Sequence, residues 1–93
     1  MRVAQIIEQK LTAALEPAQI EVIDKSHLHE GHAGAREGGE SHFRVTIVAD
    51  AFTDLNRVAR QRKVYEVLAD ELAGPIHALA LSTMTPTEAD SRA

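Results

Sequence analysis

The sequence contains no cysteine and no tryptophan, and its 93 residues include only two phenylalanines and one tyrosine. Without cysteine, the chain forms no disulfide, offers no thiolate nucleophile and cannot hold an iron–sulfur cluster on thiolates of its own. With so few aromatic side chains, the core is expected to consist of Ala, Val, Leu and Ile. Few rings are also available to stack on nucleic-acid bases.

The chain also lacks an excess of positive charge. Ten Lys and Arg stand against fourteen Asp and Glu, which gives a formal net charge of −4 at pH 7. Such a chain has no overall attraction to phosphate backbones, so a nucleic-acid contact would require a local basic patch. A chain this short has little room for both a core and an enclosed cleft, which favours a binding module over an enzyme.

No apolar run approaches the length of a membrane span, and the first residues lead into an amphipathic pattern without the apolar segment of a secretory signal. We therefore expect a cytoplasmic protein without membrane association, monomeric or weakly dimeric when alone. Residues 1–86 are expected to form a single domain, and residues 87–93 a polar C-terminal tail.

The first half of the chain has the pattern of one helix followed by two strands. Apolar residues recur at spacings of three and four over residues 3–15, which predicts an amphipathic helix that Pro17 ends. Branched residues over 20–24 predict a strand, and the alternation that begins at His42 predicts a second strand antiparallel to it. Four of the five glycines lie between these strands, so residues from about 25 to 41 are expected to form a loop.

The second half has the pattern of two helices and a last strand. Thr53 or Asp54 is expected to cap a short helical turn, and a longer helix is expected to end at Gly74-Pro75. Small and branched residues over 76–84 predict the third strand, which a helical connection allows to run parallel to the second. The predicted fold is α+β, in the order α-β-β-α-α-β, with helices on one face of a three-stranded mixed sheet.

Five histidines are the most unusual feature, because three of them fall in the loop as His-Leu-His-Glu-Gly-His over residues 27–32. Imidazole is the commonest transition-metal ligand, and a loop can bring several imidazoles to one ion. The loop histidines can be solvated residues with no common role, or zinc ligands, in which case His27, His29 and His32 would act with or without His77. His42 opens a strand and is interpreted as a packing or hydrogen-bonding residue. From its position alone, His77 is interpreted as a core histidine that a backbone carbonyl satisfies.

Four of the ten basic residues gather where the two predicted helices meet, namely Arg57, Arg60, Arg62 and Lys63. Local charge there could meet phosphates although the whole chain is acidic. The alternative is a solvated helix start, where basic residues are slightly unfavourable against the helix dipole, and this mild misplacement favours a contact role. No nucleophile elbow and no phosphate-cradling Gly-Lys-Ser/Thr motif is present, so we expect no catalytic residue.

Several segments, taken in their order and spacing, resemble the BolA family over almost the whole chain. They are Asp24-Lys25-Ser26, Gly31-His32-Ala33-Gly34, Ser41-His42-Phe43-Arg44-Val45, Phe52, Arg60-Gln61-Arg62 with Val64-Tyr65, and Ile76-His77-Ala78-Leu79-Ala80-Leu81. The resemblance implies a fold similar to the class II KH arrangement, which agrees with the predicted element order. The sequence departs from the family pattern at Gln61, where histidine is frequent, and at Asp54, where glycine is frequent.

The resemblance also implies a partner. BolA-like proteins associate with monothiol glutaredoxins and share a [2Fe–2S] cluster with them and their glutathione, in iron–sulfur trafficking or iron regulation. In the family, the histidine of the final strand is a cluster ligand, which corresponds to His77, and a second ligand comes from the loop, where His32 is the best match. His29 and His27 are further candidates. The absence of cysteine agrees with shared ligation, since two imidazoles can complete a cluster whose thiolates come from a partner.

A nucleic-acid-binding regulator is the second hypothesis, because some BolA-like proteins are described as transcriptional regulators. It would use the patch from Arg57 to Lys63. The segment between the helices lacks the Gly-x-x-Gly loop with which KH domains clamp a nucleic-acid backbone, which counts against this hypothesis. The two hypotheses differ in what they require, since cluster sharing depends on His77 and DNA binding on the basic patch.

Overall fold

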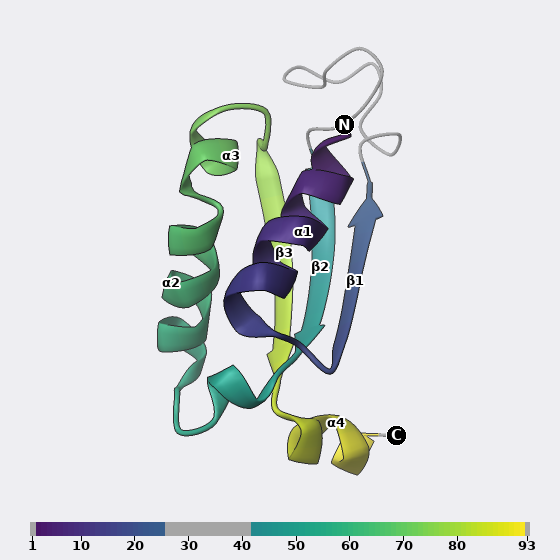
Figure 1. Ribbon diagram of the computed structural model, residues 1–93, viewed down its shortest axis with the longest axis vertical. Helices are drawn as coiled ribbons and strands as arrows, with labels where there is room; N and C mark the ends of the chain where they lie inside the picture. The colour runs from purple at the N-terminus through teal and green to yellow at the C-terminus, as the bar shows by residue number, and fades with distance from the viewer. Residues whose placement is uncertain (1, 26–41, 93) are drawn as a thin grey trace.

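The structure is a computed structural model that describes residues 2–25 and 42–92, and it shows a sheet with helices on one of its faces (Figure 1). The elements follow one another as α1 (Val3–Leu15), β1 (Gln19–Asp24), β2 (His42–Val48), a 3-10 turn η2 (Asp50–Phe52), α2 (Arg57–Val67), α3 (Ala69–Ala73), β3 (Ala78–Met84) and α4 (Pro86–Arg92). No helix among these residues is long and apolar enough to cross a membrane.

The sheet has β2 at its centre. β1 pairs antiparallel with β2, from Gln19 opposite Val48 to Asp24 opposite Phe43. β3 pairs parallel with β2, from His42 opposite Ala78 onward. The predicted α+β class and the three-stranded mixed sheet are confirmed, because the alternation in β2 and the helical crossover to β3 leave one face of the sheet to be covered by helices.

The core lies between the sheet and the helices on that face (Figure 1). From α1 it takes side chains spaced four residues apart, so that one stripe of the helix is buried. From β2 it takes alternate residues, whose side chains point to the same face. Its members are Ile7, Leu11, Leu15, Phe43, Val45, Ile47, Ala49, Phe52, Val64, Leu68 and Ile76. The core is aliphatic apart from its two phenylalanines, as the composition indicated.

The helices of the second half begin at other residues than predicted. Neither Thr53 nor Asp54 caps the start of a helix; Asn56 caps α2, and its side chain accepts a hydrogen bond from the Ala59 N–H at 2.8 Å. Asn56 has the extended backbone of an N-cap, whereas Asp54 has a φ of 67° and turns the chain in the left-handed region. Glycine adopts that region without strain, so the glycine that the resemblance leads us to expect at this position would suit the turn.

The structure also differs from the predictions in the other elements of the second half. The predicted longer helix is interrupted at Leu68, which separates α2 from α3. Because α2 begins at Arg57 and runs without a break to Val67, the four basic residues lie in its first two turns and not between two helices. The expected polar tail is largely the helix α4, and β3 begins at Ala78, so Ile76 and His77 precede the strand. Polar composition obscured α4, because its apolar side chains are too few to produce a helical period.

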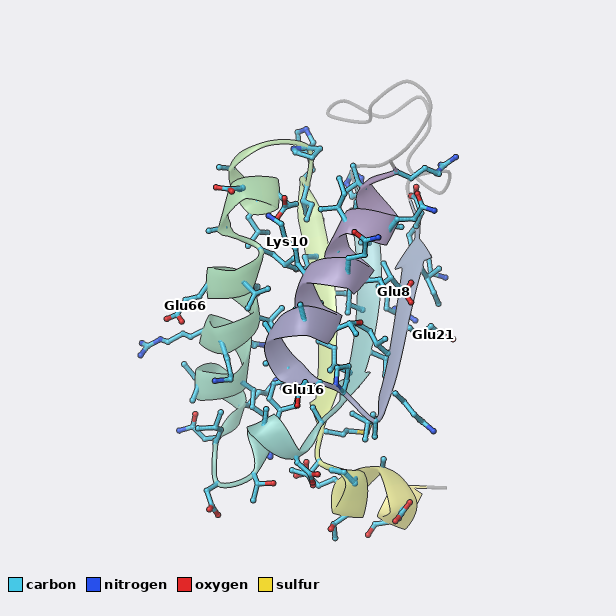
Figure 2. The ribbon with its side chains drawn as sticks, in the orientation of Figure 1. Glu8, Lys10, Glu16, Glu21 and Glu66 are labelled. Carbon is cyan, nitrogen blue, oxygen red and sulfur yellow. The ribbon has the colours of Figure 1, made fainter. Side chains whose placement is uncertain are left out.

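Lys10 ties the first helix to α3 through ion pairs with Glu71, at 2.8 Å, and with Asp70, at 3.9 Å. Lys10 Nζ donates to both carboxylate oxygens of Glu71, at 2.9 and 2.8 Å. Figure 2 labels Lys10 on α1, together with Glu8, Glu16, Glu21 and Glu66. The hydrogen bond to Glu71 raises the pKa of Lys10 above its ordinary value. This contact holds the middle of α3 against α1, and α3 leads directly into the turn before β3.

Candidate functional site

The candidate site lies at the end of the sheet where β2 and β3 begin. The two strands are parallel, so their amino ends meet at the same edge, with His42 opposite Ala78 and His77 immediately before Ala78. The imidazole rings of His42 and His77 are stacked, with centroids 6.1 Å apart and planes 9° from parallel. Two of the five histidines are therefore brought together although they lie far apart in the sequence.

The backbone around His77 is held on both sides. Before it, the Ile76 N–H donates to the Glu71 carbonyl at 3.0 Å and the Ile76 side chain is buried in the core. After it, Ala78 enters β3. The His77 side chain itself is exposed, so the sequence-based interpretation of a core histidine is wrong. The core position in this segment belongs to Ile76, whereas His77 lies in the bend before β3 with its side chain exposed.

His42 is half-buried at the start of β2, and its carbonyl accepts a hydrogen bond from the Lys25 N–H at 2.7 Å. Its ring contact with His77 is the kind that a packing residue makes, in line with the interpretation from sequence. Lys25 and His42 are the described residues on either side of positions 26–41, and both lie at the sheet edge that carries His77.

The loop candidates His27, His29 and His32 lie outside the described residues. Their role as ligands therefore stays a prediction. Within residues 2–25 and 42–92, no three or more His, Asp or Glu side chains are grouped so that they could hold a metal ion. The described part of the chain offers an imidazole pair and no closed ligand set, so a four-ligand zinc site would need ligands from elsewhere.

The basic residues of α2 divide into two groups. Arg57, Arg62 and Lys63 have exposed side chains and no ion pair among the described residues. The Arg60 side chain is only 13% exposed, because its guanidinium is bonded within the fold. Arg60 thus presents little of its charge to a phosphate, and the patch that a nucleic acid could meet is reduced to three cations.

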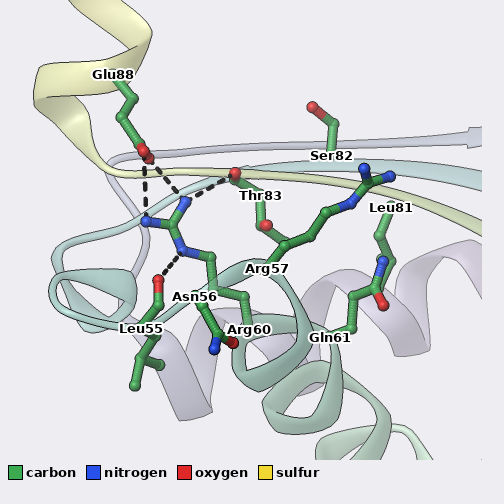
Figure 3. A pocket seen from close by; sticks show the side chains of 9 residues that line it. All are labelled: Leu55, Asn56, Arg57, Arg60, Gln61, Leu81, Ser82, Thr83 and Glu88. Atoms are coloured by element: carbon green, nitrogen blue, oxygen red, sulfur yellow. Dashed lines mark hydrogen bonds and ion pairs between the residues drawn. The ribbon is translucent and has the colours of Figure 1, made fainter.

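Arg60 connects three segments of the chain (Figure 3). Its Nε donates to the Leu55 carbonyl at 2.9 Å, and Nη1 donates to the Thr83 carbonyl at 3.2 Å and to Glu88 Oε1 at 2.7 Å. The guanidinium also lies 5.8 Å from the centre of the Phe52 ring. We call this set of contacts the Arg60 clamp. It joins α4 to the end of β3 and to the start of α2.

The Arg60 clamp also sets the electrostatics of Glu88. The hydrogen bond from Arg60, followed by one from the Thr85 backbone N–H, lowers the pKa of the Glu88 carboxyl to about 2. Thr85 Oγ1 in turn accepts from the Glu88 N–H at 3.2 Å, which completes a reciprocal capping box at the start of α4. The sequence Thr85-Pro86-Thr87-Glu88 carries this signal, with proline at the first helical position, and could have predicted α4.

A cavity of about 490 Å³ lies beside the clamp, between α2 and β3 (Figure 3). Arg57, Gln61 and Ser82 provide polar groups on its wall, and Leu81 provides an apolar one. Of the three exposed cations of α2, Arg57 lines this cavity, whereas Arg62 and Lys63 line a separate one.

The fold and the site together define a small α+β module with an exposed histidine held at one end of its sheet. Comparison with known proteins gives the family. A family model described as BolA-like protein matches residues 11–88. The DNA-binding transcriptional regulator BolA of Escherichia coli K12 is 44% identical over 88 residues, which cover 95% of this chain and 80% of that protein.

A Sinorhizobium protein named for the cobS 5′ region is 45% identical over 89 residues, 95% of this chain and 96% of that protein. The solved structure of the BolA domain of SufE1 from Arabidopsis thaliana matches with a TM-score of 0.82 at 41% identity, over 91% of this chain and 93% of that chain. The chain belongs to the BolA family, and the resemblance seen in the sequence is confirmed. The Escherichia coli relative is named as a regulator and not as an enzyme.

Proposed function

We propose that this protein shares a [2Fe–2S] cluster with a monothiol glutaredoxin and its glutathione, and that it acts in iron–sulfur trafficking or iron regulation. The observation that supports the proposal most directly is the exposure of His77 on a backbone held by Ile76 and by β3. An imidazole that is exposed and fixed in position can reach a metal ion on another chain, whereas a core histidine cannot. His32 is the proposed second ligand.

The donor set of the chain fits such a shared cluster. There is no cysteine in the sequence, and residues 2–25 and 42–92 hold no group of three ligating side chains, so this part of the chain can complete a ligand set but not enclose one. A bound cluster would supply one-electron redox chemistry, and imidazole ligation raises its reduction potential relative to all-thiolate ligation. The contribution of this chain is to offer neutral imidazole nitrogen at a defined place. No residue of it is assigned a catalytic role.

The test is to mix the purified protein with a monothiol glutaredoxin that carries [2Fe–2S], and to record visible absorption and circular dichroism. The wild type is expected to give a new spectrum, which His77→Ala and His32→Ala alter or abolish. His27→Ala and His29→Ala decide which loop histidine is the second ligand. Arg44→Ala, an exposed change on β2, is the control and is expected to behave as wild type. A spectrum that stays that of the glutaredoxin alone in every mixture would contradict the proposal.

A nucleic-acid-binding regulator is the second candidate. Two observations favour it: the Escherichia coli relative is named as a DNA-binding transcriptional regulator, and Arg57, Arg62 and Lys63 are exposed on the first two turns of α2. Cations in such a patch bind phosphates and release counterions, so affinity for DNA would fall as salt rises.

This candidate is tested by fluorescence anisotropy with labelled duplex DNA over a series of salt concentrations. Reversing the charge of Arg57, Arg62 and Lys63 to Glu is expected to abolish binding, and each single change to Ala is expected to reduce the salt slope by about one. Arg44→Glu makes the same charge change on β2 and serves as the control. His77→Ala is expected to leave DNA binding unchanged. Binding that survives all three reversals would exclude this patch.

A further inference from the structure

The stacked pair of imidazoles suggests a role for His42 that neither its sequence position nor the family comparison assigns. We propose that His42 is a positioning residue: its ring holds the imidazole of His77 in one orientation, and His42 is not itself a ligand. The inference rests on the proposed function, because His77 is taken as the ligand that this chain supplies.

The first step concerns the freedom of His77. An exposed side chain can adopt three staggered χ1 rotamers, each of which would point the imidazole in another direction. Stacking on a neighbouring ring favours one of them by about two- to tenfold, the range that aromatic pairs contribute. Groups that orient a ligand in this way are a regular part of metal sites, since a ligand held in advance loses less freedom on binding.

The second step explains why His42 is not the second ligand. The lone pair of an imidazole nitrogen lies in the plane of its ring, so a metal ion must lie close to the plane of every imidazole that binds it. The planes of His42 and His77 are stacked and only 9° from parallel, with centroids 6.1 Å apart. Their lone pairs therefore run in separate planes and do not converge on one ion. One ring of the pair can ligate while the other supports it.

The third step assigns the two roles. His77 is exposed and precedes its strand, whereas His42 is half-buried and is the first residue of β2, with its carbonyl bonded to the Lys25 N–H. The ring that a partner can reach is that of His77. The parallel register of His42 with Ala78 keeps the two rings next to each other, so the sheet itself sets the distance between support and ligand.

His42 can be changed without removing a core residue, because the buried position at this end of β2 is Phe43. His42→Phe keeps a planar ring and has no nitrogen, whereas His42→Ala removes the ring. Arg44→Ala is the matched control on the same strand. Thermal unfolding followed by circular dichroism establishes that each variant is folded before it is used.

The first measurement uses the isolated protein and needs no cluster. Three-bond couplings between the Hα and Hβ protons of His77 report its χ1 rotamer. We expect the couplings to show one rotamer of His77 more populated in the wild type, His42→Phe and Arg44→Ala than in His42→Ala, by about two- to tenfold. Couplings that are the same in the wild type and in His42→Ala would overturn the proposal.

The second measurement uses the mixture with cluster-loaded glutaredoxin. Pulsed electron paramagnetic resonance on the reduced cluster counts the imidazole nitrogens bound to iron. We expect the same count in all four proteins, and a capture of the cluster about two- to tenfold weaker in His42→Ala alone. Loss of one nitrogen in both His42→Phe and His42→Ala would make His42 a ligand and overturn the proposal. If the wild type captures no cluster, the proposed function is wrong. The coupling measurement on the isolated protein would still show whether His42 orients His77.

Discussion

The guanidinium of Arg60 forms hydrogen bonds with three segments of the chain. It bonds to the Leu55 carbonyl before α2, to the Thr83 carbonyl in β3 and to the carboxylate of Glu88 in α4. Because the Arg60 side chain is mostly buried while Glu88 is about half exposed, water screens only one side of the pair. Lysine could not replace this arginine, because its single ammonium group cannot reach all three acceptors, which the planar guanidinium of Arg60 contacts through more than one of its nitrogens.

The ion pair between Arg60 and Glu88 makes the free energy of unfolding depend on pH in the acidic range. The folded-state pKa of Glu88 is about 2, against an ordinary value of 4.5, so the unfolded chain takes up a proton at Glu88 first as pH falls. The contribution of Glu88 to stability is therefore present above about pH 4.5 and is lost as pH falls toward 2.

Urea unfolding at pH values from 7 to 2 tests this dependence. The wild type is expected to be more stable than Glu88→Gln at pH 7, and the difference is expected to shrink below about pH 4.5. Glu66→Gln, at an exposed site on α2, is the control and is expected to show no such trend. A difference between wild type and Glu88→Gln that stays constant down to pH 2 would contradict the ion pair.

Among the elements, α2 and α4 show two ways in which a helix start is specified. α2 begins with a single cap, the Asn56 side chain, which accepts from the Ala59 N–H. α4 begins with a capping box between Thr85 and Glu88. Since Glu88 also pairs with Arg60, the same carboxylate caps α4 and docks it, and this double use lets so short and polar a helix form.

Removing the cap of α2 is expected to have a measurable cost. Asn56→Ala should lower the free energy of unfolding by about 1 kcal/mol, because one N–H of the first turn loses its acceptor. Asn56→Asp keeps an acceptor oxygen and should stay close to wild type. The measurement is urea unfolding at pH 7. Equal losses for the two variants would mean that Asn56 contributes through packing and not through its cap.

At the scale of the whole molecule, the histidine pair and the Arg60 clamp lie near different ends of β3. The strand begins next to His77, which is stacked on His42, and it reaches the Arg60 clamp at Thr83. The histidine pair and the clamp therefore lie toward opposite ends of the sheet. Changes at the clamp are expected to alter stability and the cavity beside α2, and to leave the surroundings of His77 as they are.

The hydrophobic core is a second feature at the scale of the whole molecule. Phe52 is fully buried under the helices, whereas Val58 is 55% exposed on α2. Phe52→Ala should lower the free energy of unfolding by about 3 to 5 kcal/mol, a large part of the total for a domain of this size. Val58→Ala should change it by less than about 0.5 kcal/mol. Urea unfolding measures both, and a small effect at Phe52 would show that the core collapses around the smaller side chain.

The sequence by itself determined the elements whose signals are local. The apolar period of α1, the stop at Pro17 and the alternation in β2 depend on neighbours within a few residues, and they predicted the mixed sheet. The capping box of α4 is equally local. It was overlooked because a polar segment without an apolar period resembles a tail.

Only the tertiary structure decided what the side chains of the candidate sites contact. The partners of Arg60 in β3 and α4 lie 23 and 28 residues further along the chain, where no local pattern reveals them. From its charge alone, Arg60 is a candidate for a phosphate contact, whereas in the fold its guanidinium joins these segments. His77 was interpreted as a core residue because it lies among apolar neighbours. Its exposure and its stacking on His42 follow from the register of two strands that are distant in sequence, and no local pattern encodes that register.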